Sequence, residues 1–167
     1  YDHRYVFEEI GYNIKPLEIQ AALGLEQIKK LPMLESARRH NFARFTKIFE
    51  KYEQYFHLPQ PTDKADPCWF AYLLTVKDDA PFERQDIVNA LESAKIQTRA
   101  YFAGNILYHP GYIDLATKYK DLATTFPNAH LATTNSFFLG TFAGITEEKV
   151  DYIERVVDAF MQRATIK

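Results

Sequence analysis

The chain has 167 residues, of which 47% are hydrophobic and 25% are charged, and its formal net charge at pH 7 is −2. These values predict one folded domain with its own core, and they exclude a disordered chain and a basic nucleic-acid-binding surface. No apolar run reaches the roughly 20 residues of a membrane span, and the single cysteine, Cys68, excludes an internal disulfide or cysteine cluster, which fits a cytoplasmic protein.

The chain begins with "YDHRYVF" and lacks an initial methionine. We expect it to be a piece of a longer protein, with a processed N-terminus as the alternative. Residues 1–12 should form a short strand or an extended arm. Pro16 suits the first turn of a helix that Pro32 should end. The apolar residues of this helix recur at helical spacing and are Leu17, Ala21, Leu25 and Ile28.

A second, longer helix is expected after Pro32. Its apolar stripe consists of Leu34, Ala37, Phe42, Phe45, Phe49, Tyr52 and Phe56. The basic residues that lie largely off this stripe are Arg38, Arg39, Arg44, Lys47 and Lys51. We interpret these charges as a solvated face of the helix.

The rest of the chain alternates strands and helices. β-branched and aromatic runs predict strands at 68–76, 96–102 and 136–142, and loops are expected at 60–67 and 103–112. Helices are expected at 83–94, within 113–123, over "FPNAHLATTN", and after the N-cap Thr146. The core-facing residues of the last helix should be Val150, Ile153, Val157, Phe160 and Met161. This order predicts an α+β fold with a sheet of three or four strands, covered mainly on one face by helices.

Familiar catalytic and metal-binding motifs are absent from the sequence. The five histidines, at positions 3, 40, 57, 109 and 130, lack metal-ligand spacing, and no G-x-G-x-x-G or P-loop motif occurs. Asp78 and Asp79 are expected to cap a turn rather than to catalyse. On motifs alone, the chain therefore carries no complete active site and no metal site.

Two loops have compositions that suit ligand binding. In "GYNIK", Asn13 precedes a helix and Lys15 adds charge, a combination that suits a phosphate. The alternative is that Asn13 caps the helix or forms a turn.

The second such loop is "TRAYFAGNILYHPGY". Arg99 can bind a phosphate or carboxylate through two parallel hydrogen bonds, and Gly104 and Asn105 allow close backbone approach. The aromatic residues that could stack on a base or sugar are Tyr101, Phe102 and Tyr108. The alternative is a polar turn whose aromatic residues fold into the core.

Three long stretches together resemble a known family. They are "YDHRYVFEEIGYNIKPLEIQAALGLEQIKKLP", "WFAYLLTVKDDAPFERQDIVNALESAKIQTRAYFAGNILYHPGY" and "TTNSFFLGTFAGITEEKVDYI". They are similar to the C-terminal part of the DegT/DnrJ/EryC1/StrS sugar aminotransferases and dehydratases, which have the fold-type I architecture of pyridoxal-phosphate enzymes. Lys15 and "TRAYFAGN" resemble most the branch of CDP-4-dehydro-6-deoxyglucose 3-dehydratases.

The resemblance implies a division of the chain and roles for its residues. Residues 1–32 would contact another domain or subunit, and residues 33–167 would form the small C-terminal domain. Asn13 would reach across a homodimer to the cofactor phosphate, with Lys15 near the same site. The residues expected to contact the nucleotide-linked 4-keto-6-deoxysugar are Arg99, Phe102, Gly104, Asn105, Tyr108 and His109. Tyr108 departs from the basic residue that the branch often has there.

The same resemblance implies that the chemistry needs segments outside this chain. In the branch, pyridoxamine phosphate is the cofactor, a histidine replaces the usual lysine, the sugar loses its C3 hydroxyl, and a 2Fe-2S cluster and a reductase partner take part. Cys68 does not match a ligand of that cluster, so the isolated chain should be inactive. An upstream lysine would make the parent an aminotransferase instead. A further alternative is a stand-alone binding or interaction module.

Overall fold

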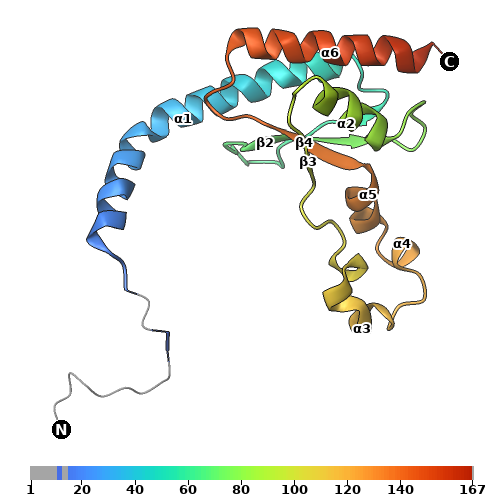
Figure 1. Cartoon of the computed structure of the whole chain (residues 1–167), viewed down its shortest axis with the longest axis horizontal. Helices are drawn as coiled ribbons and strands as arrows, with labels where there is room; N and C mark the ends of the chain where they lie inside the picture. Colours follow the sequence, from blue (N-terminus) through green and yellow to red (C-terminus); the bar gives the residue numbers. More distant parts are fainter. Residues whose placement is uncertain (1–10, 13–14, 167) are drawn as a thin grey trace. The chain divides into compact units, whose positions relative to one another are not determined.

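The computed structural model describes residues 11–12 and 15–166 and divides the chain into two compact units, Tyr1–Met33 and Leu34–Lys167 (Figure 1). The strand or arm expected at residues 1–12 falls largely outside the described part, as does Asn13. Gly11 and Tyr12 are exposed and have no regular secondary structure. The role predicted for residues 1–32, in contacts with another domain or subunit, stays a prediction.

Helix α1 spans Glu18–Glu50 and contains Pro32 in its interior. The expectation that Pro32 ends one helix and that a second follows is therefore wrong. Proline lacks only its own N–H and so removes the single hydrogen bond to the carbonyl of Ile28, while the neighbouring turns can still form theirs. The helix also ends earlier than expected, because Phe56 belongs to strand β1 instead of the helical stripe.

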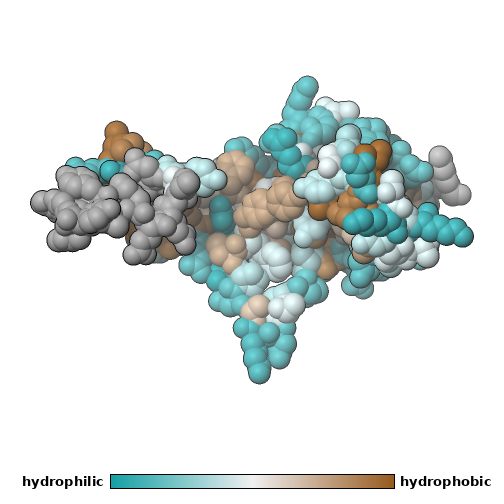
Figure 2. Space-filling view, turned by 90° about the horizontal axis from the view of Figure 1, so that it is seen from below, coloured by the Kyte–Doolittle hydropathy of each residue, from teal (hydrophilic) through white to brown (hydrophobic). Residues whose placement is uncertain are grey.

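The first half of α1, in the unit Tyr1–Met33, keeps its large apolar side chains at the surface. Six of them, together with Leu17 just before the helix, are between 55% and 68% exposed: Ile19, Leu23, Leu25, Ile28, Leu31 and Met33. The space-filling view shows brown, hydrophobic residues at the surface next to teal, hydrophilic ones (Figure 2). A run of this kind is typical of a surface that another part of a larger assembly covers.

The second unit is built on a four-stranded antiparallel sheet in the order β1-β2-β4-β3. The strands are β1 (Phe56–His57), β2 (Ala71–Val76), β3 (Arg99–Ala100) and β4 (Ser136–Gly140). The predicted α+β class and strand number are confirmed, but the strand expected at 96–102 is reduced to two residues. Only Arg99 and Ala100 lie opposite β4, at Phe138 and Phe137, and the backbone turns away at Phe102.

Helices α1, α2 (Arg84–Ser93) and α6 (Glu147–Thr165) share one hydrophobic core with the sheet. Alternate strand residues, Tyr72, Leu74, Val76, Phe137 and Leu139, are buried in this core. The five core-facing residues predicted for the last helix are all buried, so that prediction is confirmed. Period-two alternation places Leu73 and Phe138 on the opposite face, where both stay partly exposed.

The connection from β3 to β4 consists of short helical segments. They are the 3-10 turns Ile106–Tyr108 and Pro110–Tyr112, followed by α3 (Ile113–Ala116), α4 (Leu122–Thr125) and α5 (Pro127–Asn135). The helix predicted over "FPNAHLATTN" is confirmed as α5. Thr146 stands at the N-cap of α6, as predicted, but its hydroxyl donates to the Glu148 carboxylate (3.0 Å) and makes no capping bond.

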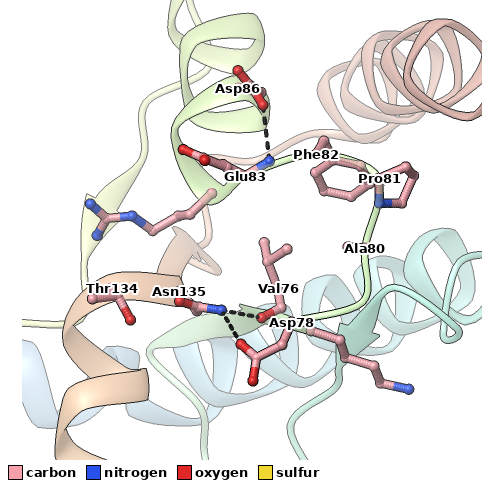
Figure 3. A pocket seen from close by; sticks show the side chains of 11 residues that line it. Val76, Asp78, Ala80, Pro81, Phe82, Glu83, Asp86, Thr134 and Asn135 are labelled. Carbon is pink, nitrogen blue, oxygen red and sulfur yellow. Dashed lines mark hydrogen bonds between the residues drawn. The ribbon is translucent and has the colours of Figure 1, made fainter. Parts of the chain in front are cut away.

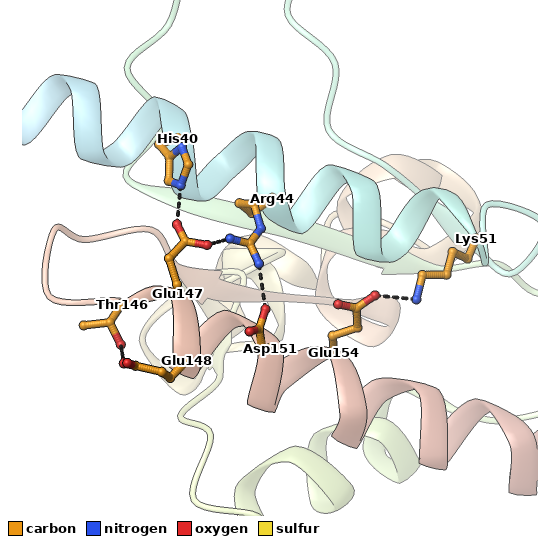
Figure 4. A network of polar contacts seen from close by, with 8 residues as sticks. All are labelled: His40, Arg44, Lys51, Thr146, Glu147, Glu148, Asp151 and Glu154. Atoms are coloured by element: carbon orange, nitrogen blue, oxygen red, sulfur yellow. Dashed lines mark hydrogen bonds and ion pairs between the residues drawn. The ribbon is translucent and has the colours of Figure 1, made fainter.

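Two of the basic residues interpreted as a solvated face also pair with α6: the half-buried Arg44 of α1, and Lys51 directly after α1, which stays exposed (Figure 4). Arg44 pairs with Glu147 and with Asp151 (2.8 Å), and Lys51 pairs with Glu154 (2.7 Å). The Lys51–Glu154 hydrogen bond raises the pKa of Lys51. Sequence periodicity could not reveal these pairs, because they depend on which face α6 presents to α1.

Among residues 11–12 and 15–166, none of the helices combines the length and apolar composition needed to cross a bilayer. Over the same residues, no group of three or more His, Cys, Asp or Glu side chains is arranged to hold a metal ion. Cys68 is exposed and free.

Candidate functional site

The edge strand β3 places Arg99 on the accessible face of the sheet. Arg99 is the cross-strand partner of Phe138, which in turn pairs with Leu73. Directly opposed residues of antiparallel strands project to the same side, so Arg99 points away from the helix-covered core. Within the described part of the chain, no carboxylate lies within 4 Å of its guanidinium, and its side chain is exposed. Arg99 can therefore offer its planar donor fork to an anion.

Glu92 stabilises the segment that leads into β3. Its Oε1 accepts hydrogen bonds from the backbone N–H of Thr98 (2.5 Å) and from the Thr98 hydroxyl (2.8 Å). These bonds lower the pKa of Glu92, and the charge of Arg99 adds a smaller effect in the same direction. The carboxylate thus fixes the backbone immediately before Arg99 without forming an ion pair with it.

A left-handed turn follows β3. Phe102 and Gly104 have φ angles of +50° and +59°, a region that non-glycine residues rarely adopt. A Cβ atom on Gly104 would lie 2.3 Å from Oγ1 and 2.9 Å from Cα of Thr133, in helix α5. Only glycine fits at position 104, because both the backbone conformation and the close approach of α5 exclude a side chain.

Thr133 also binds the next residue of the loop. Its Oγ1 accepts a hydrogen bond from the Asn105 N–H (2.7 Å) and donates one to the Ala129 carbonyl (2.7 Å). Asn105 is almost fully buried, with 5% of its surface exposed. Its Oδ1 accepts a hydrogen bond from the Leu107 N–H (3.1 Å). The direct substrate contact predicted for Asn105 stays a prediction, but this geometry gives Asn105 a structural task inside the loop.

Aromatic rings gather on the accessible face of the sheet beside this turn. The Phe102 ring lies 6.1 Å from Phe70 and 5.7 Å from Phe138, measured between centroids, and Phe70 lies 5.5 Å from Phe138. Phe102 is 68% exposed and Phe70 is 54% exposed. Sequence reasoning identified Phe102 and Tyr101, whose ring centroid lies 5.5 Å from that of Phe102. It missed Phe70 and Phe138, because their meeting with Phe102 depends on the strand register.

The two remaining predicted residues of this loop are held by hydrogen bonds. The Tyr108 hydroxyl lies 2.8 Å from Nδ1 of His130 in α5. The His109 Nε2 lies 2.9 Å from the Ala103 carbonyl, and because a carbonyl only accepts, this nitrogen carries the proton. Tyr108 thus attaches the loop to α5, and His109 stabilises the loop internally.

Of the two residues predicted to hold a phosphate, Lys15 alone lies in the described part of the chain. Lys15 is exposed and precedes the start of α1 at Glu18. The N–H of Leu17 donates to Oε1 of Gln20 (3.0 Å), so the side chain of the helix itself satisfies one donor there. The helix begins later than expected, and the exposed Lys15 is available to an anion.

A separate, open pocket of about 920 Å³ lies between the end of β2, the start of α2 and the end of α5 (Figure 3). Asn135 donates to the Val76 carbonyl (2.9 Å) and to Asp78 (3.1 Å), so Asp78 contacts α5, and the turn-capping role expected for Asp78 and Asp79 stays a prediction. The walls carry charges of both signs, and none of the predicted site residues lines the pocket. The candidate site is therefore the loop after β3 and the accessible sheet face.

Comparison with known proteins links this chain to sugar-modifying enzymes. A sequence profile of the DegT/DnrJ/EryC1/StrS aminotransferase family matches residues 1–160. The dTDP-4-dehydro-2,6-dideoxy-D-glucose 3-dehydratase of Saccharopolyspora spinosa is 36% identical over 99% of this chain and 35% of its own length. The lipopolysaccharide biosynthesis protein RfbH of Salmonella typhimurium is 32% identical over 96% of this chain and 36% of its own length.

A solved structure agrees with these relatives. The E. coli GDP-4-keto-6-deoxy-D-mannose 3-dehydratase with bound hydrated pyridoxal phosphate superposes with a TM-score of 0.77 at 29% identity, and the match covers 93% of this chain and 39% of that chain. The chain thus spans between 35% and 39% of the length of these three proteins.

Proposed function

Because the chain belongs to the DegT/DnrJ/EryC1/StrS aminotransferase family, we propose that it is the C-terminal domain of a cofactor-dependent nucleotide-sugar 3-dehydratase. The cofactor would be pyridoxamine or pyridoxal phosphate, and the substrate a nucleotide-linked 4-keto-6-deoxysugar. The observation that carries the proposal is the 36% identity to a dTDP-sugar 3-dehydratase over 99% of the chain. The similarity to RfbH supports a place in deoxysugar biosynthesis for lipopolysaccharide.

In this proposal the residues of the chain bind and orient the substrate. Arg99 offers an exposed guanidinium, which suits the diphosphate of a nucleotide sugar. Phe102 offers an exposed ring that can stack on a flat or apolar part of the substrate. Gly104, Asn105, Tyr108 and His109 hold the loop against α5 and against itself, which keeps Arg99 and Phe102 in place.

The chain fits the expected cofactor only in part. Lys15 is exposed and cationic, so its ammonium suits a phosphate, and Asn13 remains the second candidate. When bound, pyridoxamine phosphate supplies the electron sink that allows a sugar to lose its C3 hydroxyl. The residues that would hold the cofactor ring, and the catalytic histidine or lysine, are expected in segments outside this chain.

Further components of the parent enzyme belong to the same proposal. A 2Fe-2S cluster is held by four protein ligands, and the single cysteine of the chain could supply at most one of them. Such a cluster would take its cysteines from another segment. A homodimer, in which Asn13 and Lys15 approach the cofactor of the partner subunit, and a reductase partner are proposed on the resemblance to the branch.

The test uses the full-length protein and the 167-residue chain side by side. Each is supplied with pyridoxamine phosphate and with dTDP-, GDP- or CDP-linked 4-keto-6-deoxyglucose or its mannose-derived counterpart, with and without a reductant. Mass spectrometry of the products should show loss of the C3 oxygen with the full-length protein and none with the chain alone. Turnover by the isolated chain would contradict the assignment of the catalytic residue to another segment.

An aminotransferase is the second candidate, since the family description names that activity. The same assay separates the two, because transamination adds nitrogen to the sugar and keeps the C3 hydroxyl. A lysine at the cofactor-binding position of the full-length sequence would favour the aminotransferase, and a histidine would favour the dehydratase.

A further inference from the structure

Three phenylalanine rings form a connected surface on the accessible face of the sheet. Phe70 directly precedes β2, Phe102 lies in the turn after β3, and Phe138 lies in the middle of β4. Every pair of their ring centroids is between 5.5 and 6.1 Å apart. Two of the rings are more than half exposed. We call these three side chains the phenylalanine surface. Exposed aromatic clusters of this kind typically mark a binding site for a ligand or for another protein.

The backbone conformation of Phe102 is unfavourable, and burial of its side chain does not compensate for it. A φ angle of +50° is unfavourable for a residue with a Cβ atom. Phe102 buries only about a third of its surface, because it is 68% exposed. A strained residue whose ring remains in solvent contributes little to folding, so its conformation is better explained by a ligand that the ring contacts.

Helix α5 maintains this conformation through Thr133. The Thr133 hydroxyl accepts the Asn105 N–H, and the Thr133 backbone fills the space where Gly104 would carry a Cβ. The turn from Phe102 to Asn105 is thereby fixed at two successive residues. The position of the Phe102 ring relative to Phe70 and Phe138 depends on this attachment.

Arg99 places a positive charge beside the same surface. It lies opposite Phe138 in the β3–β4 ladder and projects from the same face. The described residues provide no carboxylate within 4 Å to neutralise it. A flat apolar surface next to an unpaired guanidinium is complementary to a planar group that carries a phosphate.

We propose that the phenylalanine surface binds the base of the nucleotide while Arg99 binds its diphosphate, and that Thr133 is a positioning residue for Phe102. This inference rests on the proposed function, because it assigns parts of that substrate to particular residues. Stacking accepts purines and pyrimidines alike. The surface would thus supply affinity for the nucleotide, and the choice of base would depend on other residues.

The first experiment measures binding to the full-length protein by isothermal titration calorimetry. The probes are dTDP, GDP and CDP, with inorganic pyrophosphate as the matched ligand that lacks a base. Phe70→Ala and Phe102→Ala should each raise the Kd of the nucleoside diphosphate that binds best by about 5- to 150-fold and leave pyrophosphate binding unchanged. Arg99→Ala should weaken both ligands.

Tyr152→Ala is the control for loss of an exposed aromatic ring. Tyr152 is 42% exposed and lies on α6, on the other side of the sheet. If the phenylalanine variants bind the nucleoside diphosphate as tightly as this control does, the inference is overturned. It is also overturned if they lower only the melting temperature, because the surface would then contact another protein segment. If the wild-type protein binds none of the nucleotides or nucleotide sugars, the proposed function itself fails.

A second experiment tests Thr133 with two variants, one that keeps its volume and one that keeps its hydroxyl. Thr133→Val removes the hydroxyl that holds Asn105, and Thr133→Ser retains it. The valine variant should raise KM for the nucleotide sugar about fivefold and leave kcat unchanged, and the serine variant should restore KM to within about twofold of wild type. Equal KM values for the two variants, or an equal loss of kcat, would refute a positioning role.

Discussion

The attachment of the loop to α5 predicts a large effect of Gly104→Ala. The added methyl group would have to occupy space that Thr133 fills, with Oγ1 at 2.3 Å and Cα at 2.9 Å. The hydroxyl could rotate away, but the backbone atom of α5 could not move without shifting the helix. The alanine would also have to adopt a φ angle near the +59° of the glycine.

The expected cost is the sum of two unfavourable terms and one favourable term. A left-handed conformation costs an alanine about 1–2 kcal/mol relative to glycine, and forcing a methyl group into a filled space costs about 1–3 kcal/mol. Alanine lowers the entropy of the unfolded chain, which stabilises the folded state by about 0.4–1 kcal/mol and offsets part of this cost. We therefore expect the free energy of unfolding of this region to fall by about 1–4.6 kcal/mol.

Gly111→Ala is the matched control. No atom lies within 4 Å of the Cβ position at Gly111, and its φ angle is outside the left-handed region. The same chemical change should therefore alter stability by no more than about 0.5 kcal/mol. Comparing the two variants isolates the conformation and packing at position 104 from the general effect of replacing glycine.

Two readouts distinguish global from local unfolding. Urea unfolding monitored by the fluorescence of Trp69, the single tryptophan, which stacks on Phe42, reports on the core. Hydrogen exchange of the Asn105 amide, which Thr133 binds, reports on the loop. At least one of them should show the full loss in Gly104→Ala. If both match Gly111→Ala, the close approach of the loop to α5 is refuted.

Three further changes test other parts of the fold. Asn41→Ala removes a buried amide that donates to two backbone carbonyls after β4 (3.0 and 3.3 Å), and urea unfolding should show a loss of about 1–3 kcal/mol, whereas a neutral result would contradict the burial. Hydrogen bonds from Thr98 lower the pKa of Glu92, so their stabilisation is present above its ordinary value of 4.5 and is lost as the pH falls below it. Glu92→Gln should therefore show a smaller drop in melting temperature than wild type between about pH 6 and pH 3; equal drops would refute the effect. Lys51→Ala removes the exposed pair with Glu154 and should cost about 0–1 kcal/mol at low salt and less in about 1 M NaCl, with a larger, salt-independent loss as the contrary outcome.

The elements that the sequence predicted well are those with local causes. The last helix has apolar residues at helical spacing over its whole length, and all five predicted core positions are buried. Strands β2 and β4 could be predicted because each is a continuous run of apolar, β-branched and aromatic residues. These signals lie within one segment and require no knowledge of neighbouring segments.

The predictions of secondary structure failed where contacts with distant parts of the chain, or the length of a helix, determine the local conformation. Pro32 is a strong local signal for a helix end, yet α1 continues through it, because the favourable turns on both sides compensate for one missing hydrogen bond. Phe56 fits the helical stripe, but pairing with Val76 draws it into β1. The strand expected at 96–102 is short because the backbone turns away from β4 at Phe102, after only Arg99 and Ala100 have paired with it.

The same distinction applies to the candidate site. Arg99, Phe102 and Gly104 were identified because their residue types suit a ligand or a tight turn. Thr133 and Phe138 carried no such signal, since a threonine in a short helix and a phenylalanine in a strand are ordinary core or surface residues. They matter only because α5 meets the loop after β3 and β4 pairs with β3, through contacts between residues 28 and 39 positions apart in the chain.

The residues of β3 and of the loop that follows it have two different roles. Gly104 and Asn105 face α5: one has no room for a side chain, and the other is almost fully buried and hydrogen-bonded within the loop. Arg99 and Phe102 face solvent, and one of them is held in a conformation that packing does not explain. Substitutions at the first pair should therefore displace the second pair, whereas substitutions at the second pair should change ligand binding while the fold remains intact.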